Sequence, residues 1–217
     1  PEVREGAGNV RLPCPDLPGT LGASGGDMPF MLFVPRSCSA GVVRMAKRLC
    51  FITGGARSGK SAFAENLAGP VPGKRAYLAT AQALDAEMVA RIEHHRRRRG
   101  SAWDTFEEPL AVAELVRKLD GRYDVLLLDC LTLWLSNVVA RISTDDAVAR
   151  RVEDLAAAIE GFNGMSLIVS NEVGLGIVPD NPLARRFRDL AGLLNQRIAR
   201  SADEAYLMAA GIPVKLK

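Results

Sequence analysis

A glycine-rich run at residues 54–61, GGARSGKS, has residue types and a spacing that suit phosphate binding. It completes the P-loop pattern, in which such a run follows a strand and opens a helix. Glycines let successive backbone N–H groups point at phosphate oxygens, and the helix N-terminus adds partial positive charge. A turn that merely reverses the chain would not need the lysine and serine. The predicted nucleotide-binding residues of this run are Gly54, Gly55, Ala56, Arg57, Ser58, Gly59, Lys60 and Ser61.

Three side chains are candidates for the phosphate and metal chemistry of such a site. We expect Lys60 to reach the outer phosphates and the Ser61 hydroxyl to bind Mg²⁺. Asp129 ends the apolar run VLLLD, where a carboxylate can hold Mg²⁺ or its water beside the P-loop. Asp129 can alternatively cap the next helix, but its place at the ligand-binding edge of a sheet favours the metal role.

The stretch RIEHHRRRRG at 91–100 contains both histidines of the chain, followed by four arginines. On a helix, Met88, Ile92 and His95 share the apolar face, whereas His94 falls on the neighbouring charged stripe. His95 is therefore the histidine that we expect to face the protein. Spacing alone leaves open whether His95 is structural or catalytic. It also leaves open whether the arginines form a solvated helix end or bind phosphates.

The elements that must position these residues alternate between strand and helix from residue 48 onward. Strands are predicted over 49–53, 76–80, 124–130, 166–171 and 204–210, and helices over 60–68, 84–98, 108–119, 145–161 and 182–201. Nearly continuous apolar strands are typical of a parallel sheet covered on both faces. The fold class is thus predicted as α/β, a mostly parallel, doubly wound P-loop NTPase sheet of the RecA-like kind. The terminal GIPVKLK predicts a short antiparallel strand.

The helix predicted over 182–201 has a clear start signal. Asn181 can accept a backbone N–H as N-cap, and Pro182 suits the first helical position. One buried stripe is expected to contain Leu183, Phe187, Leu190, Leu194 and Ile198.

The composition is that of an ordinary globular protein, with 48% hydrophobic and 24% charged residues in 217. A net charge of +3 is too small to indicate a nucleic-acid or membrane-surface partner. No apolar run approaches the roughly 20 residues that span a bilayer, so no membrane span is expected. Cysteines 14, 38, 50 and 130 show no metal-ligand spacing, which predicts free thiols in a reducing compartment, the cytoplasm.

The first 44 residues differ from the rest of the chain. They contain six of the twelve prolines and seven of the twenty glycines, without a sustained hydrophobic period. They also lack the charged and apolar regions of a signal peptide. We expect residues 1–44 to be disordered or a non-native upstream extension, and residues 45–217 to form the P-loop domain. The apolar patch at 28–35 can alternatively pack on that domain.

Several longer stretches resemble one enzyme family. They are GGARSGKS, YLATAQALDAEMVARIEHHRRRRG, WDTFEEP, LLLDCLTLWLSN, SNEVGLGIVPDNPLARRFRDLAGLLNQRIA and GIPVKLK. In order and spacing they resemble the bifunctional adenosylcobinamide kinase / adenosylcobinamide-phosphate guanylyltransferase of cobalamin biosynthesis. The resemblance implies that a nucleoside triphosphate, ATP or GTP, phosphorylates adenosylcobinamide. It further implies that GTP then transfers GMP to the new phosphate, giving adenosyl-GDP-cobinamide.

The resemblance also implies roles for individual residues. His95 matches the histidine that carries the guanylyl group covalently in the family, and adjacent cations disfavour its imidazolium form. Lys60 is the second residue with an implied catalytic role. Nucleotide contacts are implied for Ala79, Thr80, Ala81, Arg96, Arg97, Arg98, Arg99, Glu107 and Asp129. Relatives are trimeric, so a homotrimer with its site near the subunit boundaries is implied as well.

Some alternatives remain open. Glu107 can accept from guanine or can be an acid at a helix N-terminus. Trp103 can stack on a ligand or be a buried anchor. For the whole protein, the nearest alternative is a P-loop small-molecule kinase without guanylyltransferase activity. A nucleic-acid-binding ATPase that uses the arginine run is less favoured, because that run is short and the rest of the chain is nearly neutral.

Overall fold

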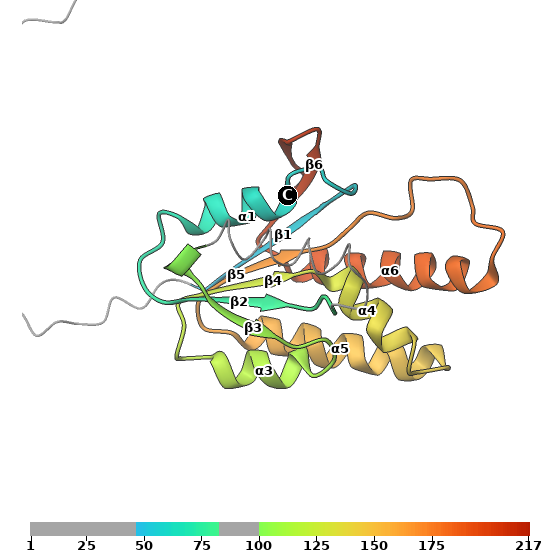
Figure 1. Ribbon diagram of the computed structural model, residues 1–217, viewed down its shortest axis with the longest axis horizontal. Helices are drawn as coiled ribbons and strands as arrows, with labels where there is room; N and C mark the ends of the chain where they lie inside the picture. The colour runs from blue at the N-terminus through green and yellow to red at the C-terminus, as the bar shows by residue number, and fades with distance from the viewer. Residues whose placement is uncertain (1–46, 83–99) are drawn as a thin grey trace, which may run out of the picture. The chain divides into compact units, whose positions relative to one another are not determined.

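The computed structural model describes residues 47–82 and 100–217 (Figure 1). Several predictions fall outside these described residues. They concern the extension over 1–44 and the helix over 84–98, together with His94, His95 and Arg96 to Arg99. The rest of the predicted fold can be compared with the structure element by element.

Within the described residues, seven strands form one sheet in the order β3-β2-β4-β5-β1-β6-β7. The strands are β1 Arg48–Gly54, β2 Arg75–Ala79, β3 Asp104–Glu107, β4 Val125–Asp129, β5 Met165–Val169, β6 Glu204–Ala209 and β7 Ile212–Lys215. Neighbours from β3 to β6 pair in parallel, and β6 pairs with β7 in antiparallel. The predicted mostly parallel sheet with a C-terminal antiparallel strand is confirmed.

The helices of the described part cover both faces of this sheet. They are α1 Lys60–Ala68, α3 Val112–Leu119, α4 Leu131–Val139, α5 Asp145–Gly161 and α6 Pro182–Ser201. Figure 1 shows α1 on one side of the strands and α3 and α5 on the other. Along β4, Val125 and Leu127 belong to the core cluster beneath α1, whereas Leu126 and Leu128 belong to the opposite cluster. Both faces are therefore buried, as a doubly wound fold requires.

Three elements of the described residues were not predicted, and one helix begins later than expected. They are the short 3₁₀ helix η1 Gly100–Ala102, the strand β3, which is mostly exposed, and α4, in which apolar residues predominate. The helix expected over 108–119 begins at Val112 instead. A turn comes first, in which Glu108 Oε1 accepts the backbone N–H groups of Leu110 at 2.9 Å and Ala111 at 2.8 Å.

The start of α6 is as predicted, but its buried stripe is shorter. Asn181 Oδ1 accepts the N–H of Leu183 at 2.8 Å, and Pro182 is the first helical residue. Leu190, together with Leu194 and Ile198, is buried in the core. Leu183 is 60% exposed, so its predicted burial was wrong. It lies in the first helical turn, before α6 reaches the core cluster.

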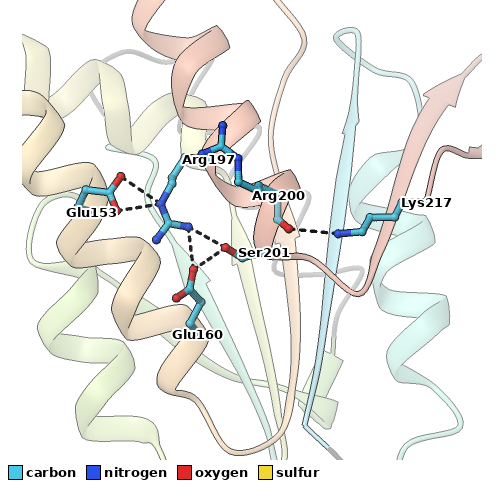
Figure 2. A network of polar contacts seen from close by, with 6 residues as sticks. All are labelled: Glu153, Glu160, Arg197, Arg200, Ser201 and Lys217. Atoms are coloured by element: carbon cyan, nitrogen blue, oxygen red, sulfur yellow. Dashed lines mark hydrogen bonds and ion pairs between the residues drawn. The ribbon is translucent and has the colours of Figure 1, made fainter.

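A polar network joins α5 to α6 (Figure 2). Arg197 of α6 bridges two carboxylates of α5, with Nε at 2.8 Å from Glu153 and Nη1 at 2.7 Å from Glu160. The Ser201 hydroxyl also donates to Glu160. Together these hydrogen bonds hold the pKa of Glu160 below its ordinary value. Beyond the helix, Lys217 Nζ donates to the carbonyl oxygen of Arg200 at 3.1 Å, which attaches the last residue of the chain to α6.

Glu204 joins three strands where β1 and β6 begin and β7 ends. Its carboxylate accepts from Arg48 of β1 at 2.6 Å, Tyr206 of β6 at 2.9 Å and Lys215 of β7 at 3.2 Å. The Tyr206 hydroxyl, with Arg48 and Lys215, lowers the pKa of Glu204 from an ordinary 4.5 to about 2. A folded-state pKa below the unfolded value stabilises the protein above that unfolded value, and the stabilisation is lost as the pH falls.

We therefore predict that Glu204→Gln lowers the free energy of unfolding at pH 7 by about 1–2 kcal/mol, since the side chain is partly hydrated. The difference from wild type should shrink between about pH 5 and pH 2, because the carboxylate becomes protonated. Urea unfolding at pH 7 and at pH 3 measures it. Glu114→Gln, at an exposed carboxylate, is the control and should change little at either pH. A difference that grows at low pH would contradict the assignment.

Candidate active site

The glycine-rich run connects the end of β1 to the start of α1, as predicted. Gly54 has φ 142°, and a side chain there would meet the carbonyl oxygen of Met208 on β6. Gly59 has φ 94° and directly precedes the first residue of α1. Both positions therefore need glycine. Between them, Gly55, Ala56 and Arg57 are exposed, so their backbone is accessible to a ligand.

The Lys60 ammonium lies inside this loop and is 7% exposed. Its Nζ donates to the carbonyl oxygens of Gly54 at 3.0 Å and Gly55 at 2.6 Å, with Ser58 Oγ at 3.5 Å. A buried ammonium must be hydrogen-bonded to be tolerated, and these oxygens provide that. The loop thus surrounds a positive charge at its centre.

The two predicted metal-binding side chains lie together. Ser61, the second residue of α1, donates from Oγ to Asp129 Oδ2 at 2.6 Å. Asp129 does not cap the next helix, which was the alternative interpretation. The N-cap of α4 is Cys130, without a side-chain cap, and the carboxylate instead accepts from Ser61 and from the Tyr77 hydroxyl at 2.7 Å. A hydroxyl beside a carboxylate is the hard oxygen donor set that Mg²⁺ prefers.

The ends of three strands meet beside this pair. Ala79 of β2 lies opposite Asp129 of β4 on one side and Glu107 of β3 on the other. Ala81 follows at the same edge and is half-buried. Thr80 is fully buried, and its hydroxyl donates to the carbonyl of Cys130 at 2.7 Å and accepts the N–H of Cys130 at 3.0 Å. Thr80 therefore joins β2 to the junction of β4 and α4, and the nucleotide contacts of these residues stay predictions.

Glu107 and Trp103 each had two interpretations. The acid that bonds the backbone ahead of α3 is Glu108, whereas Glu107 ends β3 with an exposed side chain at the carboxyl edge of the sheet. Trp103 is 9% exposed and makes an edge-on ring contact with Tyr77, the centroids 6.1 Å apart. The structure supports the buried-anchor interpretation of Trp103.

The sequence pattern did not indicate a buried polar network behind the site. Ser170 Oγ donates to Asn195 Oδ1 at 2.6 Å and lies 3.2 Å from Thr132 Oγ1. Thr132 Oγ1 also accepts the N–H of Asn171 at 2.7 Å, and the Asn195 amide donates to the Asn171 carbonyl at 3.2 Å. The network fixes the start of the loop after β5. A polar residue at a buried position of α6 was the available signal.

This fixed loop is joined to the P-loop. The N–H of Glu172 donates to the carbonyl oxygen of Gly54 at 3.0 Å. The next residues include the exposed apolar side chains of Leu175 and Ile177, which are 84% and 98% exposed. The position of the P-loop therefore depends on contacts from the far side of the sheet as well as on its own glycines.

Three further features of the described residues bear on other kinds of site. None of their helices is long and apolar enough to span a membrane. In the same part of the chain, no three His, Cys, Asp or Glu side chains form a cluster that could bind a metal. Cys50 and Cys130 are free and buried, and burial raises the pKa of each thiol to about 11. Both thiols are therefore protonated at neutral pH.

A strand, a P-loop and a helix, with Lys60, Ser61 and Asp129 at the carboxyl edge of a parallel sheet, define a P-loop NTPase. Comparison with known proteins narrows this class. The family model "CobU: Cobinamide kinase / cobinamide phosphate guanyltransferase" matches residues 50–216. The chain belongs to this cobinamide kinase / cobinamide phosphate guanyltransferase family.

Three relatives are similar over most of their length. The bifunctional adenosylcobalamin biosynthesis protein CobU of Salmonella typhimurium is 41% identical, with 78% of this chain and 99% of that protein covered. CobU of Escherichia coli is 40% identical with the same coverage. The bifunctional adenosylcobalamin biosynthesis protein CobP of Pseudomonas aeruginosa is 45% identical over 76% of this chain and 95% of that protein.

Two solved structures also show similarity. A KaiC-like protein of Pyrococcus horikoshii has a TM-score of 0.42 at 10% identity, covering 74% of this chain and 70% of its own. The RadB recombinase has a TM-score of 0.44 at 16% identity, covering 74% and 73%.

The buried network predicts a difference between two neighbouring residues of α6. Asn195→Ala should lower the free energy of unfolding by about 1–3 kcal/mol, because it leaves the buried Ser170 hydroxyl without its acceptor. Gln196→Ala, at an exposed neighbouring position, should change stability by less than about 0.5 kcal/mol. Urea unfolding of both variants measures the contrast. Equal effects would show that the network does not contribute to stability.

Proposed function

We propose that this protein phosphorylates adenosylcobinamide with a nucleoside triphosphate and then transfers GMP from GTP to adenosylcobinamide phosphate. The products of the second step are adenosyl-GDP-cobinamide and pyrophosphate. The observation that carries this proposal is the family match over residues 50–216, which includes the P-loop and Asp129. The names of the relatives, bifunctional adenosylcobalamin biosynthesis proteins, support it.

In the kinase step the P-loop holds the triphosphate by backbone N–H groups, and Lys60 stabilises charge on the outer phosphates. The hydroxyl oxygen of the aminopropanol group attacks the γ-phosphorus and loses its proton. The bond from the γ-phosphorus to the β–γ bridging oxygen breaks, and a nucleoside diphosphate leaves. Ser61 and Asp129 would hold Mg²⁺, which neutralises phosphate charge when bound. Their hydrogen bond supports this pairing.

In the second step a ring nitrogen of His95 attacks the α-phosphorus of GTP, and pyrophosphate leaves. An oxygen of adenosylcobinamide phosphate then attacks the same phosphorus, and the phosphorus–nitrogen bond breaks. A phosphate monoester is a weak nucleophile, so division into two displacements lowers the difficulty of each. The assignment of His95 rests on the resemblance and on the sequence spacing, which predicts one helical face for Met88, Ile92 and His95.

The remaining proposed contacts surround the nucleotide. Arg96 to Arg99 bind its phosphates, and Glu107 accepts from guanine N–H groups. Ala79, Thr80 and Ala81 contact the nucleotide at the end of β2. The exposed position of Glu107 at the carboxyl edge supports its part. We further propose a homotrimer without a nucleic-acid partner, located in the cytoplasm, where the free thiols of Cys50 and Cys130 would stay reduced.

Covalent guanylylation provides the sharpest test. Incubation with α-labelled GTP and Mg²⁺, followed by denaturation, should leave acid-labile, base-stable label on the wild-type protein. His95→Asn should abolish this label, because it removes the attacking nitrogen. His94→Asn is the matched control, one residue away, and should keep the label. Label retained by His95→Asn would move the nucleophile elsewhere. A kinase without guanylyltransferase activity would give no label in any variant.

Lys60 tests the phosphate site itself. Lys60→Met should lower kcat/KM for phosphorylation of adenosylcobinamide by about 10²–10³-fold, because one preorganised positive donor is lost from the site. Initial rates with varied triphosphate measure this loss. Lys118→Met, on the exposed side of α3, is the control and should keep the wild-type rate. A folded Lys60→Met protein with an unchanged rate would rule out this role.

A further inference from the structure

Tyr77 of β2 contacts the candidate metal site through Asp129. Its side chain is 3% exposed, and its hydroxyl donates to Asp129 Oδ2 at 2.7 Å. Ser61 donates to the same oxygen at 2.6 Å. One carboxylate oxygen therefore accepts from α1 and from β2 at once. Two donors from different elements restrain rotation of the carboxylate more than either donor alone.

The Tyr77 ring is itself held in place. In the ladder between β2 and β4, Tyr77 lies opposite Leu127 and Ala79 lies opposite Asp129, so Tyr77 and Asp129 project from the same face. Trp103 packs edge-on against the Tyr77 ring with an interplanar angle of 86°. Backbone register and ring packing together fix the hydroxyl relative to Asp129.

We propose that Tyr77 is a positioning residue that orients the Asp129 carboxylate for the metal ion of the nucleotide complex. The proposal rests on the proposed function, because it takes Ser61 and Asp129 as the metal-binding pair. Ser61 can give a lone pair to a metal and still donate its proton to Asp129. Tyr77 donates to the same oxygen from β2, so Asp129 keeps its orientation when the metal binds. Such supporting hydrogen bonds commonly tune metal affinity.

The test is metal binding rather than turnover. Tyr77→Phe removes the hydroxyl and keeps the ring against Trp103. With GDP present, free Mn²⁺ is measured by electron paramagnetic resonance, and GDP binding is measured separately in EDTA. We expect Tyr77→Phe to raise the Mn²⁺ dissociation constant about tenfold and to leave metal-free GDP binding within about twofold. An unchanged Mn²⁺ dissociation constant would overturn the proposal.

The chain offers a matched control for the loss of a tyrosine–aspartate hydrogen bond. The Tyr123 hydroxyl donates to Asp104 Oδ2 at 2.9 Å, and its ring packs edge-on against Phe106, the centroids 5.7 Å apart. This pair lies where β3 and β4 begin, at the opposite end of the strands from Asp129. Tyr123→Phe should leave the Mn²⁺ dissociation constant within about twofold of wild type. An equal weakening in both variants would indicate a general loss of stability and would overturn the proposal.

Two further variants separate the effect of the Tyr77 hydroxyl from that of its ring packing against Trp103. Trp103→Phe keeps the Tyr77 hydroxyl, so its Mn²⁺ dissociation constant should stay within about threefold of wild type. A larger rise would show that ring packing, not the hydroxyl, determines Mn²⁺ affinity and would overturn the proposal. This variant gives the answer even if Tyr77→Phe fails to fold. In an Asp129→Asn background, adding Tyr77→Phe should have little further effect, because the two residues act through one contact. Additive effects would contradict the proposal. If wild-type protein binds no GDP at all, the proposed function fails instead.

Discussion

The hydrogen bond from Ser61 to Asp129 depends on the alignment of strands that are not neighbours. In the sheet, β5 separates β4 from β1. Asp129 lies opposite Val169, and Val169 lies opposite Ile52, so the three residues form one row across the sheet. The P-loop begins two residues beyond Ile52 and leads into α1. Ser61 at the start of α1 then lies with its Oγ 2.6 Å from Asp129 Oδ2. A shift of one residue in the ladder between β4 and β5 would turn the Asp129 side chain to the other face.

Buried polar groups maintain this alignment at the carboxyl edge. The Thr80 hydroxyl bonds both backbone groups of Cys130, directly after Asp129. The network of Ser170 and Asn195 fixes the loop that donates to Gly54. Polar groups buried in this way are costly unless paired, so each one specifies a single arrangement of the backbone around it. Buried polar side chains behind the site, such as Ser170 and Asn195, therefore help to hold the P-loop in place.

Patterns that act locally made much of this structure predictable from the sequence. Asn181 followed by Pro182 determined where α6 begins, and the glycine, lysine and serine spacing identified the P-loop. Elements and contacts that depend on distant partners were not predictable. The strand β3 is paired only because β2 offers an edge. Leu183 follows the helical period and is still exposed, because the core ends before it. Likewise, the sequence pattern predicts Tyr77 only as a buried strand residue, and its hydrogen bond to Asp129 depends on how β2 aligns with β4.

The two proposed reactions break different bonds of a bound nucleoside triphosphate. The kinase step breaks the bond to the γ-phosphoryl group, whereas guanylyl transfer breaks the bond between the α and β phosphates. A P-loop that binds the outer phosphates serves both steps, because the γ-phosphate is the transferred group in the first and the β- and γ-phosphates together are the leaving group in the second. The nucleophile changes between the two steps, whereas the P-loop that binds the phosphates stays the same. The rigid arrangement of Lys60, Ser61 and Asp129 is consistent with such a shared role, and the choice of reaction then falls to the residues that deliver the attacking atom.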